Sequence, residues 1–153
     1  MPTVAEATLL LVEDGTEYRS FFELFLADPY TVVHTQNGAA ALSALAAGGI
    51  DAIVLDMRFD RTPTELLLGD VDEVTRRHFG RDRDRALRYL QDQQGTLILE
   101  TIRQAGHVHP ALFISDMPPR RALNLRKLYG AVAAVPGFDA AAIRSALRDL
   151  GVG

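Results

Sequence analysis

Three acidic residues and a serine stand directly after strongly apolar stretches of the chain. Glu13 and Asp14 follow the first stretch, and Asp56 follows the second. Ser115 follows a third. A short, uninterrupted apolar run is typical of a strand that is buried on both faces of a parallel sheet. Because ligands of open α/β sheets bind beyond the carboxyl ends of the strands, these four residues are candidates for chemistry.

The carboxylates indicate a cation site. If the strands before Glu13 and Asp56 are neighbours, three carboxylates converge on one place and repel one another. A divalent cation relieves this repulsion, and Mg²⁺ prefers oxygen ligands of this kind. An aspartate beside Mg²⁺ can also act as a nucleophile toward a phosphoryl group. Stabilisation of acidic residues by a helix dipole is the simpler explanation of Glu13 and Asp14, but it leaves Asp56 unexplained. We therefore prefer the functional interpretation.

The elements that position these residues alternate along the chain. Strands are expected near residues 8–12, 30–34, 51–55, 111–115 and 131–135. Helices are expected between them, and the first carries an apolar stripe at helical spacing, formed by Tyr18, Phe21, Phe22, Phe25 and Leu26. Asp139 is expected to cap the last helix. Strands that alternate with helices predict βαβ units, and hence an α/β fold with a doubly wound parallel sheet.

Residues 57–94 interrupt this alternation. We interpret them as a helical insertion after the third strand, between that strand and the third helix, within a single domain of residues 1–153. Residues 66–74 could form one helix, and the whole segment is expected to pack beside the carboxyl edge of the sheet. Five leucines of the insertion are expected to need burial: Leu66, Leu67, Leu68, Leu87 and Leu90.

Composition excludes several classes of protein. The chain has 153 residues and no cysteine, so a disulfide framework and a thiolate metal site are excluded. The net charge of −4 favours no binding to nucleic acid. No apolar run is long enough to span a membrane, and the N-terminus has neither the basic stretch nor the apolar core of a secretory signal. A cytoplasmic location is therefore expected.

The sequence resembles the receiver domains of two-component response regulators. Residues 10–14 resemble the family's acidic pair after the first strand, 53–57 the segment around the phosphorylated aspartate, 113–115 the end of the fourth strand, and 130–131 the Gly-Ala before the fifth. The resemblance covers nearly all of the chain except the insertion. It implies a flavodoxin-like (βα)5 fold with strand order 2-1-3-4-5.

The resemblance also implies roles for the candidate residues. Asp56 would accept a phosphoryl group. Glu13, Asp14, Asp56 and the backbone carbonyl of Arg58 would hold Mg²⁺. Ser115 would be the switch residue that donates a hydrogen bond to the phosphoryl oxygen. No catalytic residue beyond these is implied, and we expect no enzymatic activity.

Two departures from the family pattern predict an impaired switch. The family has a lysine before a proline at the end of the fifth strand, but Val135 precedes Pro136 here and the single lysine of the chain is Lys127. The aromatic switch residue of that strand is also missing, with Ala134 in its expected place. An alternative is that Arg58 or Arg61 of the insertion reaches into the acidic pocket and replaces the lysine.

Three functions remain open at this stage. The first is an atypical single-domain receiver that binds a protein partner, namely a histidine kinase, a phosphotransfer protein or an output protein, with a homodimer as a further option. The second is a degenerate receiver that interacts with its partner without phosphorylation. The third is an Mg²⁺-dependent phosphohydrolase with Asp56 as nucleophile, which is disfavoured because Arg58 occupies the position of that class's second aspartate and its catalytic lysine is missing.

Overall fold

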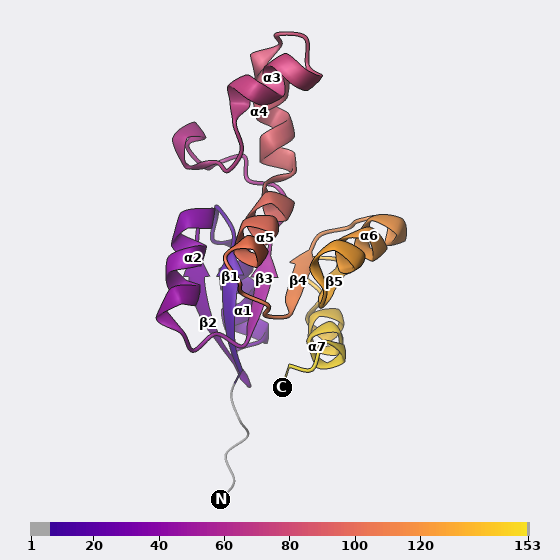
Figure 1. Ribbon diagram of the computed structural model, residues 1–153. Coiled ribbons are helices and arrows are strands. Elements are labelled where there is room, and N and C mark those ends of the chain that lie inside the picture. The colour runs from indigo at the N-terminus through magenta and orange to yellow at the C-terminus, as the bar shows by residue number, and fades with distance from the viewer. Residues whose placement is uncertain (1–6, 153) are drawn as a thin grey trace, which may run out of the picture.

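A central five-stranded parallel sheet organises the chain (Figure 1). The computed structural model describes residues 7–152; the first six residues, part of the N-terminus in which no secretory signal is expected, lie outside this range. The strand order is β2-β1-β3-β4-β5, and all four neighbouring pairs are parallel. The predicted fold and strand order are therefore confirmed. The strands are β1 (Ala7–Val12), β2 (Tyr30–Thr35), β3 (Ala52–Leu55), β4 (Ala111–Ile114) and β5 (Val132–Val135).

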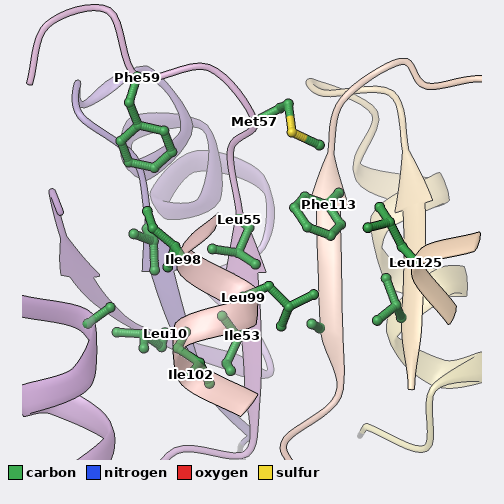
Figure 2. Packing of buried hydrophobic residues seen from close by; sticks show 14 of the residues in the cluster. Leu10, Ile53, Leu55, Met57, Phe59, Ile98, Leu99, Ile102, Phe113 and Leu125 are labelled. Atoms are coloured by element: carbon green, nitrogen blue, oxygen red, sulfur yellow. The ribbon is translucent and has the colours of Figure 1, made fainter. Parts of the chain in front are cut away.

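Helices cover both faces of this sheet. Successive side chains of a strand point to opposite faces, so the central strands need apolar residues at every position. One core cluster packs Leu10, Ile53 and Phe113 against α2 (Gly38–Ala47), α5 (Gln94–Gln104) and α6 (Pro119–Tyr129) (Figure 2). The other packs Leu11 and Val54 against α1 (Glu17–Phe25) and α7 (Ala140–Asp149). This two-sided burial explains the continuous apolar runs of the sequence.

Polar side chains begin several of these helices. Asn37 accepts a hydrogen bond from the backbone N–H of Ala40 at the start of α2. Asp139 accepts one from Ala142 at the start of α7, which confirms the predicted cap. Such caps satisfy N–H groups that have no partner inside the helix. No helix among residues 7–152 has both the length and the apolar character that crossing a membrane requires.

The insertion between β3 and α5 is mainly helical, as predicted, but its path differs from the prediction. It contains a 3-10 turn η1 (Thr64–Leu66) and the helices α3 (Val71–His78) and α4 (Arg83–Asp92). The prediction of one helix over 66–74 was wrong, because Gly69 adopts a φ of 96° and Asp70 caps a new helix. Leu66 is 43% exposed, so its expected burial was also wrong.

Only the inner part of the insertion packs on the sheet. Phe59 and Leu67 join the core with α5, and Leu87 of α4 packs against that core. Otherwise α3 and α4 pack on each other around Val71, Ala86 and Leu90. The α3–α4 hairpin therefore extends beyond the carboxyl edge of the sheet (Figure 1). The expected packing beside that edge holds for the base of the insertion and not for its tip, because the apolar residues of the tip bury one another.

Buried hydrogen bonds hold the base of the insertion in place. Gln94 is 1% exposed. Its amide nitrogen donates to the backbone carbonyls of Leu68 and Leu90, and its amide oxygen accepts from the N–H of Leu68 at 2.7 Å. The N–H of Gly95 donates to the carbonyl of Met57 at 2.9 Å. The segment that follows Asp56 is thus bound to the first turn of α5.

Candidate functional site

The carboxyl ends of β1, β3 and β4 bring the predicted site residues together. Glu13, Asp14 and Asp56 line one hollow of about 290 Å³. Asp56 and Ser115 line a second hollow of about 560 Å³. Asp56 belongs to both hollows because β3 lies between β1 and β4. The convergence arises from strand order, since the three segments are far apart in the sequence.

Glu13 follows β1, is 1% exposed and binds the first turn of helix α1. Its two carboxylate oxygens accept hydrogen bonds from the backbone N–H groups of Tyr18, at 3.2 Å, and Arg19, at 3.0 Å. The N-cap residue Thr16 makes no side-chain capping bond, so Glu13 supplies it from the strand end. Burial raises the pKa of Glu13 to about 7 although both N–H bonds oppose the shift, and the negative charges of Asp56 and Glu17 raise it further.

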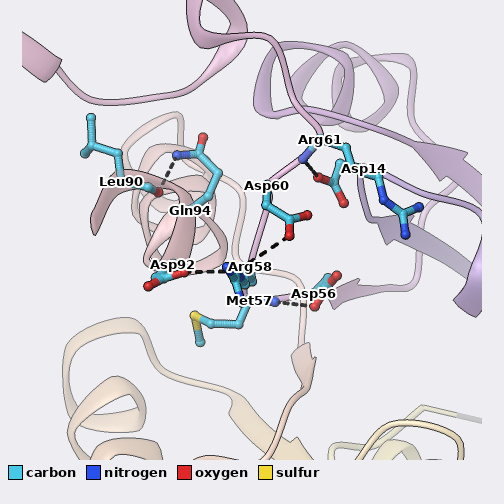
Figure 3. A network of polar contacts seen from close by, with 9 residues as sticks. All are labelled: Asp14, Asp56, Met57, Arg58, Asp60, Arg61, Leu90, Asp92 and Gln94. Carbon is cyan, nitrogen blue, oxygen red and sulfur yellow. Dashed lines mark hydrogen bonds and ion pairs between the residues drawn. The ribbon is translucent and has the colours of Figure 1, made fainter. Parts of the chain in front are cut away.

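Asp14 and Asp56 have different neighbours. Asp14 accepts a hydrogen bond of 2.6 Å from the backbone N–H of Arg61 in the insertion (Figure 3). Asp56 accepts one of 2.8 Å from the N–H of Met57. Burial raises the pKa of Asp56 to about 6, the charges of Asp14 and Asp60 raise it as well, and the N–H groups of Met57 and Arg58 oppose the shift. Asp56 therefore titrates within the physiological range.

Asp14 and Asp56 fit a magnesium site better than Glu13 does. Mg²⁺ is usually held by one or two carboxylates together with water and phosphate oxygens, and this pair lines one hollow with Arg58. The carboxylate of Glu13 already accepts two N–H groups, one on each oxygen, so fewer of its lone pairs are free for a cation. Among residues 7–152, no three His, Cys, Asp or Glu side chains are grouped so as to hold a metal ion.

The two arginines that could replace the family's lysine have other partners. The guanidinium of Arg58 lies 3.1 Å from Asp92 and 3.8 Å from Asp60 (Figure 3). The guanidinium of Arg61 lies 2.6 Å from Glu17. Both side chains are more than half exposed. The structure thus gives no support to the alternative that one of these arginines neutralises the charge on Asp56.

Tyr18 is a site residue that the sequence analysis missed. It lines both hollows together with Asp56. Its hydroxyl donates a long hydrogen bond of 3.5 Å to the backbone carbonyl of Ile114, and its ring stacks on Phe138 at 4.6 Å. Burial and the charge of Asp56 raise the pKa of Tyr18. The sequence did contain a signal for this residue. Among the five residues of the apolar stripe of the first helix, only Tyr18 carries a hydroxyl group, and it stands nearest to the acidic residues that follow β1.

Solved receiver domains share this fold. The signal receiver domain of a putative Luxo repressor protein from Vibrio parahaemolyticus matches with a TM-score of 0.65 and 16% identity over 95% of this chain and 90% of that one. The receiver domain of the Francisella response regulator 1452 matches with 0.62 and 13% over 95% and 96%. The Vibrio cholerae chemotaxis protein CheY4 matches with 0.64 and 18% over 95% and 99%.

Sequence comparison adds no assignment to this structural likeness. No known family profile matches the chain, and no curated protein matches it. The likeness to receiver domains at these identities establishes the fold. In this chain, the acidic residues Glu13, Asp14 and Asp56 lie at the carboxyl edge of the sheet.

Proposed function

We propose that this chain is a receiver-type signalling domain of a phosphorelay, in which Asp56 accepts a phosphoryl group and the domain acts by binding a protein partner. The observation that carries the proposal is the position of Asp56. It follows the central strand of a receiver fold and lies between Asp14 on one side and Ser115 on the other. The partner would be a histidine kinase, a phosphotransfer protein or an output protein.

The transfer step follows from the chemistry of the carboxylate. A carboxylate oxygen of Asp56 attacks phosphorus, a P–O bond forms, and the bond from phosphorus to the donor's nitrogen or oxygen breaks with its electron pair leaving on the donor. Bound Mg²⁺ would supply charge neutralisation at this step. The N–H of Met57 already holds one oxygen of Asp56, which orients the carboxylate.

Neutralisation of the phosphoryl charge is incomplete in this site. Val135 stands where the family's lysine is expected, and Arg58 and Arg61 pair with acidic residues elsewhere. A phosphoryl group biases a two-state domain only through contacts that differ between the states. We therefore propose that the switch is impaired and that partner binding depends only weakly on phosphorylation.

A degenerate receiver that acts without phosphorylation is the second candidate. One observation favours it: two members of the acidic cluster have structural roles. Glu13 caps α1, and Asp14 binds the backbone of the insertion at Arg61. Acidic residues with such roles would persist even if the site received no phosphoryl group.

Phosphorylation by a small donor tests the proposal. After incubation with acetyl phosphate and Mg²⁺, we expect slow, partial addition of the mass of one phosphoryl group, because no lysine or unpaired arginine side chain lies beside the acceptor. Asp56→Asn should abolish the addition, since an amide is not a comparable nucleophile. Intact-protein mass spectrometry measures both results.

Asp84→Asn is the matched control, because Asp84 is an exposed aspartate on α4 outside both hollows. It should label like the unchanged protein. Labelling that persists in Asp56→Asn would place the acceptor elsewhere. No labelling of the unchanged protein would favour the degenerate receiver.

Magnesium binding is predicted to depend on Asp14 and Asp56. Each substitution by asparagine removes a negative charge and replaces one carboxylate oxygen with an amide nitrogen, so each should weaken Mg²⁺ binding by about tenfold or more. Calorimetric titration at a pH above 7 keeps Asp56 ionised, since its pKa is about 6. Unchanged affinity in both variants would place the metal elsewhere.

A further inference from the structure

The Tyr18 ring fills space that the chain leaves open at the end of β5. A Cβ atom at Gly137 would overlap the Tyr18 hydroxyl and lie 2.6 Å from a ring carbon. Glycine at position 137 therefore admits the tyrosine beside the segment where the resemblance places a lysine. The Tyr18 hydroxyl reaches this point from α1, on the same side of the sheet edge as Asp56.

Phe138 fixes the plane of this ring. Its ring stacks on Tyr18 with an interplanar angle of 21° and meets Phe21 edge to face at 5.4 Å. Phe138 has a φ of 61°, a left-handed conformation that is an outlier for a bulky residue. Such strain persists only where the surroundings hold it. The loop after β5 is thus shaped around Tyr18.

Few hydrogen-bond donors other than the Tyr18 hydroxyl line the hollow that would hold a phosphoryl group on Asp56. The larger hollow is lined by Tyr18, Asp56, Ser115 and Arg58, among others. Arg58 is paired with Asp92. The side chains that line this hollow therefore include two hydroxyl groups, one from Ser115 directly after β4 and one from Tyr18 in α1, and no unpaired cation.

We propose that the Tyr18 hydroxyl is a second donor, beside Ser115, to a phosphoryl oxygen on Asp56, and that it replaces the family's lysine in part. The inference rests on the proposed function, because it requires a phosphoryl group on Asp56. In the unmodified protein the hydroxyl donates to the carbonyl of Ile114. On phosphorylation it donates to the charged oxygen instead, since a hydrogen bond to an ionised acceptor is the stronger one.

This exchange supplies a contact that differs between two states. Ile114 is the last residue of β4 and directly precedes Ser115, so release of its carbonyl changes the strand end that carries the switch hydroxyl. Tyr18 also stacks on the loop between β5 and α7 through Phe138. A hydroxyl carries no positive charge, so it stabilises the charge of a phosphoryl group less than an ammonium group does. This agrees with an impaired switch.

Beryllofluoride, which mimics a phosphoryl group on aspartate, tests the inference. Its affinity, with Mg²⁺ present, is measured by calorimetry for the unchanged protein, Asp56→Asn, Tyr18→Phe and Tyr89→Phe. Tyr18→Phe keeps the stacked ring and removes only the hydroxyl, so we expect about tenfold weaker binding, the size typical of a hydrogen bond to a charged group. Tyr89→Phe removes the same atom from α4, outside both hollows, and should bind unchanged.

The carbonyl ¹³C chemical shift of Ile114 separates this role from a structural one. Adding beryllofluoride to the unchanged protein should move this shift toward its value in free Tyr18→Phe, because both lose the same hydrogen bond. If beryllofluoride binding requires Asp56 but is equally tight in Tyr18→Phe and the unchanged protein, the inference is overturned and the proposed function stands. Binding unaffected by Asp56→Asn would overturn the proposed function itself.

Discussion

Replacing Gly95 with alanine is expected to lower the free energy of unfolding by about 3 kcal/mol, at the upper end of the usual cost of overpacking. Gly95 lies in the first turn of α5, against the backbone that follows β3. A Cβ atom at this position would overlap the carbonyl oxygen of Asp56 and lie 2.9 Å from the Cα of Met57. Backbone atoms cannot rotate away as a side chain can.

The direction of this effect opposes helix propensity. Alanine is favoured over glycine inside a helix by about 1 kcal/mol, so propensity alone predicts a gain in stability. We expect the clash to dominate, and the N–H bond from Gly95 to the carbonyl of Met57 to be lost with it. Denaturant unfolding measures the free energy, and the amide resonances of Met57 and Arg58 report the displacement beside Asp56.

Gly38→Ala is the matched control. Gly38 begins α2, and the nearest atoms to a Cβ there are side-chain atoms, of Leu68 at 2.8 Å and of Ile98 at 3.4 Å, rather than backbone atoms. Its stability should change by less than about 1 kcal/mol, because a side-chain end can move aside. Equal stability of Gly95→Ala and the unchanged protein would show that α5 is free to shift away from Asp56.

In metal-free buffer, the free energy of unfolding is expected to fall as the pH rises from about 4.5 to about 7. Burial raises the pKa of Glu13 from 4.5 to about 7, so the folded protein holds a proton that the unfolded chain has released. A group of this kind stabilises the fold below its unfolded pKa and loses that contribution as the pH passes its folded pKa. Asp56, whose pKa is raised to about 6, acts in the same direction.

Glu13→Gln isolates the larger contribution. One unit of pKa shift corresponds to about 1.4 kcal/mol, so the stability difference between the variant and the unchanged protein should move by about 2–3 kcal/mol between pH 5 and pH 8. The amide accepts only one of the two α1 N–H bonds, which adds a cost that does not depend on pH. Denaturant unfolding at several pH values measures the difference. A difference that is constant with pH would show that Glu13 is ionised throughout this range.

Much of the fold could be predicted because its signals are local. The strands buried on both faces require apolar residues at every position, and the runs before Glu13, Asp56 and Ser115 show this directly. A helix such as α1, which buries only one face, shows the helical period in the spacing of its apolar residues. Because connections in such folds are right-handed, alternation of the two patterns leaves few topologies to choose from.

The site could be predicted only as far as strand ends determine it. Asp56 and Ser115 follow their strands immediately, and Asp14 stands one residue further on, so the sheet alone brings the three to one edge. A role of Glu13 at a helix start was one of the two explanations that the sequence offered, but its partners Tyr18 and Arg19 were not predictable, because the entry angle of their helix is set by packing. The same holds for Arg58 and Arg61, whose partners come from other elements.

The sequence by itself determined the sheet, its flanking helices and the acidic edge, since each depends on residue type at short spacing. Only the tertiary structure decided the path of the insertion, where Gly69 and Asp70 end one turn and begin a new helix. It also decided that Tyr18 lines both hollows with Asp56, because the position of the Tyr18 ring depends on the missing side chain of Gly137. Contacts between distant segments depend on complementary shape, which no local pattern of the sequence records.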